Sequence, residues 1–391
     1  MDRRKLFLFL IILLLFCGCG KKEVEKSSYW LPPITDDDGE MVLLLNTEVR
    51  LTVLDEAKGE EMREVLNETV IHYHQLLDSH HYYSADGKRI NNLKVLNDSY
   101  GTETAVSVDP DLIAALQESF TLAELTEGYF NPTIGVLSDL WTPKFSSQEH
   151  YDSDPDAKEI KTALACKLEV SELRDIIEID ETNSTVTFHK SDRCTGSVKI
   201  DLGAFTKGYV IDKGYEKLTG YETSFLIDGG SSSVITYTQE GEEPSWTVGI
   251  RSPNNESMLY AFKADNTALS TSGDYERYFL TADADGHVIR RHHILDPFSG
   301  FSKNFYRGIT LVSQRNAGVL DALSTALFSM TPEQQRKVIA NIEKHYNIKI
   351  EKSLLVEEEK KLVLQLDPSF RDRLLNDLVS SELNKIVTAA E

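Results

Sequence analysis

The sequence is poor in cysteine and lacks the common glycine-rich nucleotide motifs. Only four of its 391 residues are cysteine. It contains neither a G-x-x-x-x-G-K-[ST] phosphate loop nor a G-x-G-x-x-G dinucleotide motif. A G-x-S-x-G nucleophile elbow is absent as well. These absences argue against P-loop nucleotidases, dinucleotide-binding Rossmann enzymes and Ser-His-Asp hydrolases.

Positive charge is also scarce. The chain carries 41 Lys and Arg against 63 Asp and Glu, a net charge of −22. Nucleic acid is therefore not an expected partner, because binding its phosphates needs a basic face. The charge instead favours a well-hydrated, soluble surface.

Leu6–Phe16 is an unbroken apolar run. It is too short for an ordinary membrane-spanning helix, and basic residues precede it, which is typical of a signal peptide. A small residue then precedes Cys19, in the order of a bacterial lipobox, whereas bulky Phe16 precedes Cys17. We therefore predict a signal peptide over 1–18, a lipidated Cys19 and an extracytoplasmic, membrane-anchored lipoprotein. A plain secretory signal and an uncleaved anchor are the alternatives.

The rest of the chain divides into three predicted parts. Residues 19–40 are polar and are predicted to form a flexible tether. Residues 41–352 are predicted to form one large domain, and 353–391 a C-terminal extension that is mainly helical. Cys166 and Cys194 either form a disulfide, which export permits, or remain two buried thiols.

Periodicity and capping residues predict mixed helices and strands without regular βαβ alternation, hence an α+β fold with mixed sheets and packed helices. Helices are expected over 56–78, 109–127, 161–168, 209–218, 316–328, from 332 onward, and 370–379. Strands are expected over 42–54, 176–179, 185–189, 195–200, 223–227, 245–251, 259–264, 275–280 and 347–351.

The segment Asp201–Asp212 reads as a strand end, a turn and a helix start. Gly203 and Gly208 permit close backbone approach, and Lys207 lies in the first helical turn. Free N–H groups at a helix N-terminus, together with a lysine, suit a phosphate. An ordinary turn with a surface lysine is the alternative.

Four histidines, at positions 72, 74, 80 and 81, cluster at the end of the first predicted helix. Metal binding is one interpretation. Because His80 and His81 are adjacent and no carboxylate pattern accompanies them, structural roles are favoured.

The segment Asp201–Asp212 resembles the D-L-G-G-x-A-K-G-Y-x-x-D signature of the ApbE-like flavin transferases, or FAD:protein FMN transferases. Four further segments match this family in the expected order: Glu127–Thr133, Thr271–Arg277, His293–Pro297 with Gly300, and Asp321–Thr325. The resemblance runs from about residue 41 to about residue 350.

The resemblance implies a Mg²⁺-dependent transfer of FMN from FAD to a threonine or serine of an acceptor protein, with release of AMP. It places the metal on Asp321, Thr325 and the carbonyl of Ala204. The four-residue spacing of Asp321 and Thr325 puts both on one helix face, where their oxygens suit Mg²⁺. An Asp321 that merely caps or solvates the helix is the alternative.

By the same resemblance, six residues are flavin-nucleotide contacts: Asp201, Lys207, Tyr129, Phe130, Asn131 and, through its backbone, Leu295. His293 is the predicted proton acceptor, since an imidazole exchanges protons near neutral pH. A structural histidine is the alternative there. Asp321 is a second candidate base, although a metal-bound carboxylate is a poor one.

Three departures from the family pattern concern the flavin ring. Leu45-Asn46-Thr47 stands where Met-Gly-Thr is usual, residues 81–84 match loosely, and Asn131 replaces an aspartate.

Two other functions could use the same residues. One is an FAD pyrophosphatase that releases FMN and AMP, and the other is a non-catalytic flavin-binding lipoprotein. A solute-binding lipoprotein should show two repeated α/β halves, which are not seen.

Overall fold

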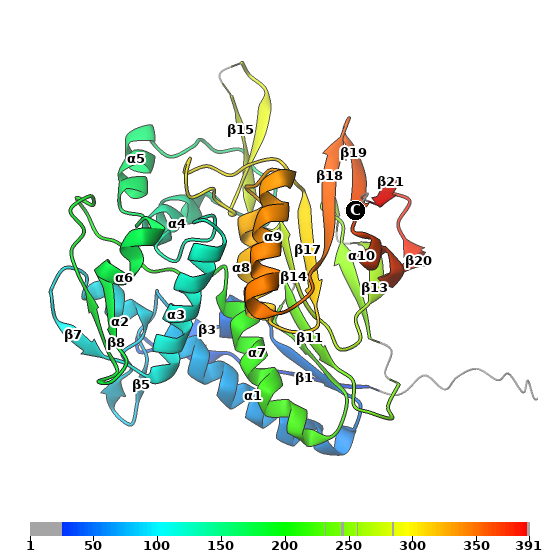
Figure 1. Ribbon diagram of the computed structural model, residues 1–391, viewed down its shortest axis with the longest axis horizontal. Helices are drawn as coiled ribbons and strands as arrows, with labels where there is room; N and C mark the ends of the chain where they lie inside the picture. Colours follow the sequence, from blue (N-terminus) through cyan, green and yellow to red (C-terminus); the bar gives the residue numbers. More distant parts are fainter. Residues whose placement is uncertain (1–25, 231, 244–245, 256, 284, 389–391) are drawn as a thin grey trace, which may run out of the picture.

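The computed structural model describes residues 26–388, except 231, 244–245, 256 and 284 (Figure 1). The predicted signal peptide and Cys19 lie outside the described residues. Within them, no helix combines the length and the apolar character that crossing a membrane requires.

A nine-stranded sheet forms the centre of the fold, in the order β1-β4-β10-β11-β14-β17-β18-β19-β21. Neighbouring strands are antiparallel, except for the parallel pair β19–β21. All six residues of β17 are buried, as expected for a central strand covered on both faces. The strands span Ser27–Trp30 (β1), Arg50–Val53 (β4), Phe225–Asp228 (β10), Ser233–Tyr237 (β11), Ala268–Gly273 (β14), Gly308–Ser313 (β17), Glu351–Glu358 (β18), Lys361–Leu366 (β19) and Leu383–Thr388 (β21).

Helices cover one face of this sheet, with α7 and α8 running along its middle (Figure 1). Capping residues mark several of their starts. The Asp109 side chain accepts from the N–H of Asp111 ahead of α3, and Thr331 forms a capping box with Gln334 ahead of α9. The helices span Glu56–Leu77 (α1), Leu93–Asp98 (α2), Pro110–Leu125 (α3), Gly135–Trp141 (α4), Ala157–Ala165 (α5), Leu173–Ile176 (α6), Thr206–Leu218 (α7), Ala317–Leu327 (α8), Pro332–Tyr346 (α9) and Pro368–Arg373 (α10).

The main hydrophobic core lies between the helices and the sheet, and a second cluster built around Phe262 and Phe370 covers part of the other face. Smaller sheets surround the large one. They consist of β2 (Ile34–Thr35) with β3 (Met41–Val42), β5 (Ser84–Ala85) with β6 (Lys88–Arg89), β7 (Ala105–Ser107) with β9 (Thr185–Phe188) and β8 (Ile177–Asp180), β12 (Thr247–Arg251) with β13 (Met258–Lys263) and β20 (Leu374–Val379), and the hairpin β15 (Tyr278–Ala282) with β16 (Val288–His292).

The α+β prediction is confirmed, and so are the helices that begin at 56, 110, 317 and 332. The helical prediction for the C-terminal residues is wrong. Among the described C-terminal residues, 353–388, only Pro368–Arg373 is helical, and β18 and β19 extend the central sheet. Leu362, Leu364 and Leu366 pack in the second hydrophobic cluster, whereas the intervening Val363 is buried outside it, so the apolar pattern there has the period of a strand.

Other predicted elements differ more locally. The tether prediction is wrong for Ser27–Trp30, which pairs with β4 as the edge strand β1. The predicted strand 195–200 is irregular, with a single bridge from Lys199 to Ile134. The strand expected over 42–54 is interrupted by a 3₁₀ turn, and the one expected over 347–351 begins only at Glu351. Burial of Val198 and Ile200 in the core, rather than a sheet ladder, explains why residues 195–200 are apolar.

The structure decides two questions that the sequence left open. Cys166 and Cys194 form a disulfide that joins the end of α5 to the segment leading toward Asp201. The histidines do not converge on one site. His74 is buried between the N–H of Leu45 and the hydroxyl of Tyr83, whereas His72 faces Asp111.

Candidate active site

The turn that leads into α7 has the conformation that the sequence predicts. Only the residues before it differ, because 195–200 do not form the predicted strand. Asp201 Oδ1 accepts from the N–H of Gly203 at 2.8 Å, and the N–H of Asp201 donates to the Pro132 carbonyl at 2.8 Å. Helix α7 then starts at Thr206, which places Lys207 in its first turn. The second contact connects the turn with the segment that contains Tyr129, Phe130 and Asn131.

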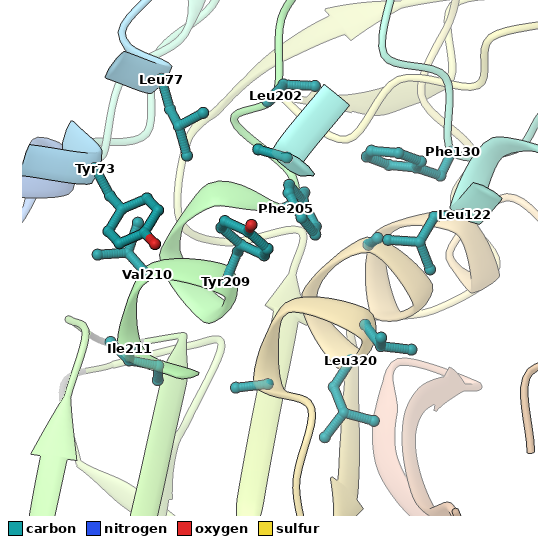
Figure 2. Close-up of a cluster of buried hydrophobic side chains, with 14 of the residues drawn as sticks. Tyr73, Leu77, Leu122, Phe130, Leu202, Phe205, Tyr209, Val210, Ile211 and Leu320 are labelled. Carbon is teal, nitrogen blue, oxygen red and sulfur yellow. The ribbon is translucent and has the colours of Figure 1, made fainter. Parts of the chain in front are cut away.

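Apolar side chains orient α7. Figure 2 shows Phe205, Tyr209 and Val210 of this region among buried side chains that include Tyr73 on α1 and Leu320 on α8. Because this face is buried, the opposite side of the first turn is left for polar groups. Lys207 is half-buried there and makes no hydrogen bond or ion pair with any described residue.

Helices α7 and α8 approach each other unusually closely, through two glycines. A Cβ on Gly208 would lie 2.2 Å from the Ala317 carbonyl oxygen, and one on Gly318 would lie 2.9 Å from Tyr209 Cα. Both distances are too short for real contacts, so only glycine permits this approach. It brings the N–H of Gly208 within 2.7 Å of Asp321 Oδ2.

Asp212, the last residue of the signature segment, also joins these helices. Its carboxylate accepts from the N–H groups of Ala317 and Gly318, both at 2.9 Å, at the start of α8. A carboxylate is favourable at a helix N-terminus. Burial raises the pKa of Asp212 to about 7, against the opposing effect of these two N–H groups. Asp212 thereby positions the helix that carries Asp321 and Thr325.

Two serines that the sequence analysis missed hold the Asp321 carboxylate. Ser233 on β11 and Ser270 on β14 each donate to Asp321 Oδ1 at 2.6 Å. Ser324 extends the network to Ser270 and Ser272. Ser270 directly precedes the matched segment that begins at Thr271, which was the available signal, but sequence spacing did not connect it to Asp321.

The three oxygens that the resemblance assigns to a metal, from Asp321, Thr325 and the Ala204 carbonyl, can each still accept a further ligand. Asp321 uses three hydrogen bonds of the roughly four that a carboxylate accepts. In a continuous helix the N–H of Gly208 would donate to the Ala204 carbonyl, but it is directed to Asp321. Among the described residues, nothing donates to the Ala204 carbonyl, and the Thr325 hydroxyl has no partner. Three oxygen donors of this kind suit Mg²⁺.

His293 is held by the backbone of Arg277. The backbone N–H of His293 donates to the Arg277 carbonyl at 3.1 Å, and the ring Nδ1 of His293 lies 3.3 Å from the same oxygen. Because a carbonyl only accepts, Nδ1 carries the hydrogen and Nε2 keeps its lone pair. Burial lowers the pKa of His293 well below its ordinary value, and the charges of Arg277, His292 and Lys207 add to this effect. His293 is therefore neutral near pH 7 and able to accept a proton.

The adjacent His292 has a different role. It is fully buried, and its Nε2 donates to the Lys303 carbonyl at 2.9 Å. Burial lowers its pKa to about 4. These contacts make it a structural histidine, which leaves His293 as the residue available for chemistry.

The other predicted cofactor contacts, Tyr129, Phe130, Asn131 and Leu295, differ in how far they are buried. Tyr129 is half-buried, and its hydroxyl accepts from Gln334 at 2.7 Å. Phe130 is 3% exposed and packs in the core against Phe205. Asn131 is buried and bonded to the Leu168 carbonyl and to Thr133. Leu295 is buried and pairs with Ser302 through its backbone.

A cleft of about 550 Å³ begins at Asn131. Phe298 lies in its wall with half of its side chain exposed, and its ring makes an edge contact with Tyr129. The cleft is lined by Glu124, Glu127, Gly128, Asn131, Lys167, Glu169, Val170, Ser171 and Phe298. Phe298, rather than Phe130, presents an aromatic face to open space.

The chain is similar in sequence and in fold to known proteins. The profile of the ApbE family matches residues 45–349. An FAD:protein FMN transferase of Treponema pallidum is 29% identical over 304 residues, covering 75% of this chain and 78% of the relative. One of Rhodobacter capsulatus is 30% identical over 298 residues, covering 75% of this chain but only 51% of the relative. The crystal structure of the ApbE protein of Thermotoga maritima superimposes with a TM-score of 0.62 at 25% identity, covering 84% of this chain and 94% of that chain.

Gly208→Ala tests the close approach of the two helices. The added methyl group must push α7 from α8, so we expect the free energy of unfolding to fall by about 1–3 kcal/mol. Chemical denaturation measures this value. Gly220→Ala is the matched control, because a Cβ there meets nothing within 4 Å, and its effect should stay within about 0.5 kcal/mol. Equal effects of the two substitutions would contradict the role given to Gly208.

Proposed function

Because the chain belongs to the ApbE family, we propose that it is an FAD:protein FMN transferase that uses Mg²⁺ held by Asp321, Thr325 and the carbonyl of Ala204. The names of the curated relatives support the reaction. One observation carries the metal assignment. The N–H of Gly208 is directed to Asp321 rather than to the Ala204 carbonyl. Among the described residues, this carbonyl and the hydroxyl of Thr325, one helical turn from Asp321, therefore have no hydrogen-bond partner.

The proposed reaction exchanges one phosphorus–oxygen bond for another. The hydroxyl oxygen of an acceptor threonine or serine attacks the FMN phosphorus of FAD. The bond from this phosphorus to the bridging oxygen breaks, and its electron pair leaves with AMP. The hydroxyl proton passes to Nε2 of His293, which is neutral and carries its lone pair there.

Charge stabilisation is the main requirement of such a transfer. Lys207 and the N-terminus of α7 supply positive charge to the diphosphate. A bound Mg²⁺ would neutralise negative charge on the phosphate oxygens. Asp201, whose N–H donates to the Pro132 carbonyl, and Asn131, which precedes Pro132, are further proposed nucleotide contacts. Tyr129 and Leu295 belong to the same proposed set, and Phe130 is restricted to a backbone contact by the burial of its ring.

The same site would also support hydrolysis of FAD, with water in place of the acceptor hydroxyl. We favour transfer because the relatives are named as transferases. A non-catalytic flavin carrier is disfavoured, because it has no need for a neutral imidazole beside a lysine and a free metal-ligand set.

We also propose that the protein is a membrane-anchored lipoprotein. The support is the order of basic residues, apolar run, small residue and Cys19 at the N-terminus. If Cys19 is lipidated, the tether to β1 is short, because Ser27 already belongs to the central sheet. The enzyme would then act on acceptors close to the membrane surface.

Cys19→Ser tests the anchor. We expect the variant to escape lipid processing and to leave the membrane fraction, because the modified thiol is gone. Mass spectrometry of the mature N-terminus and fractionation of cells measure both outcomes. Cys17→Ser is the control and should leave processing unchanged. A mature wild-type protein that does not begin at a lipidated Cys19 would contradict the proposal.

Asp321→Ala tests the metal site. Removing the carboxylate should lower metal-dependent turnover of FAD at least a hundredfold, since a lost charged ligand costs several kcal/mol. Titration of activity with Mg²⁺, and calorimetric titration of Mg²⁺ binding, measure the effect. Asp377→Ala removes an exposed carboxylate on β20 and should change neither. An unchanged Mg²⁺ dependence in Asp321→Ala would rule out this site.

Transfer and hydrolysis are separated by adding an acceptor peptide that carries one threonine. We expect slow cleavage of FAD alone, faster cleavage with the peptide, and a mass increase of one FMN on the peptide. The positioned hydroxyl must outcompete water, which requires binding of the acceptor. The same peptide with alanine should return cleavage to the slow rate. Brisk release of free FMN without labelling would favour the pyrophosphatase.

A further inference from the structure

Arg277 differs from the other arginines around the hairpin β15–β16. It lies on the turn between β14 and β15, and its side chain is exposed. Its guanidinium makes no hydrogen bond or ion pair with any described residue. The arginines near it all face carboxylates: Arg251 with Glu276, Arg290 and Arg307 with Asp274, and Arg291 with Asp154.

The position of Arg277 is nevertheless tightly defined. Its carbonyl accepts from the backbone N–H of His293 and faces Nδ1 of the same residue. The strand pairing of Tyr278 with His292 continues this contact into the hairpin. Arg277 is therefore fixed directly beside the proposed base, and its side chain begins at the active site.

Two carboxylates act on Arg277, and Arg277 in turn acts on His293. Partial desolvation lowers the pKa of its guanidinium, and the carboxylates of Asp201 and Glu276 oppose this shift. Arg277 and Lys207 both lower the pKa of His293. Two cations that have no hydrogen-bond or ion-pair partner among the described residues thus act on one imidazole, in a chain whose net charge is −22. An anionic ligand is what would neutralise them.

We propose that the guanidinium of Arg277 binds the diphosphate of FAD together with Lys207 and donates to the AMP phosphate oxygen as the phosphorus–oxygen bond breaks. This assignment rests on the proposed function. In the step, the acceptor oxygen forms its bond to the FMN phosphorus while the bridging oxygen takes the electron pair and leaves with AMP. The planar guanidinium suits this role, because its parallel N–H groups match two phosphate oxygens.

Arg277→Gln and Arg277→Lys test this proposal in the full chain. Binding of ADP and of adenosine is measured by calorimetry, so that the two ligands differ only in the diphosphate. Loss of a charge-assisted contact should weaken ADP binding by roughly tenfold to a hundredfold in Arg277→Gln, with a smaller loss in Arg277→Lys. Adenosine binding should stay unchanged. Arg336→Gln, at an exposed arginine on α9 without a partner among the described residues, controls for the loss of one positive charge.

The pH profile of kcat/KM is a second measurement, which distinguishes a role of Arg277 in the active site from a general weakening of ligand binding. The pKa of His293 is held down by Arg277, His292 and Lys207. Removing the Arg277 charge should raise this pKa, so the base is protonated at a higher pH. The acid limb of the pH profile of kcat/KM, which reports the free enzyme, should therefore move to higher pH in Arg277→Gln and stay in place in Arg336→Gln.

Unchanged ADP binding together with an unchanged acid limb in Arg277→Gln would overturn the proposal and leave Arg277 as a solvated surface residue. Equal weakening of ADP and adenosine binding would also overturn it, because the effect would not involve the diphosphate. The proposed function fails separately, if the wild-type protein labels no acceptor. Weakened ADP binding in Arg277→Gln would still support the phosphate contact in that case, since this measurement needs no acceptor.

Discussion

The hydrogen bond from the N–H of Gly208 to Asp321 is the contact on which the site depends. It exists only because α7 and α8 touch through glycines, where a Cβ on Gly208 would lie 2.2 Å from a carbonyl oxygen. This contact holds one oxygen of the Asp321 carboxylate, while Ser233 and Ser270 hold the other, and it releases the Ala204 carbonyl from the hydrogen-bond ladder of the helix. Asp212 secures the same pair of helices at the next turn by capping α8.

A second constraint acts from the opposite side of the site. The segment from β14 through the hairpin β15–β16 brings Ser270 to Asp321 and the Arg277 carbonyl to His293. The buried Asp274, paired with Arg307, holds the turn between these two contacts. One strand and its following turn therefore position the proposed metal ligand Asp321 and the proposed base His293 together. In an active site this arrangement keeps the distance between them constant.

Local features of the sequence predicted much of the fold. Asp109-Pro110 and Thr331-Pro332 are helix starts with capping chemistry, and the helices begin there. The apolar spacing in α1 and α7 likewise identified their buried faces. The C-terminal residues were misread as helix, because their short apolar stretches carry a strand period that only the pairing of β18 with β19 makes evident.

The sequence by itself determined which residues were candidates for chemistry: the Asp201–Asp212 segment, His293, and the pair Asp321 and Thr325. The resemblance of short, ordered motifs to those of the ApbE family was sufficient for this, since these groups lie in recognisable stretches. Tertiary structure alone decided their partners. Ser233 and Ser270 are 88 and 51 residues from the carboxylate that they bind, and Arg277 meets His293 only where the open ends of the strands β15 and β16 pair. Local periodicity contains no information about such contacts, because hydrogen bonds between distant segments arise only when the sheet and its covering helices pack together.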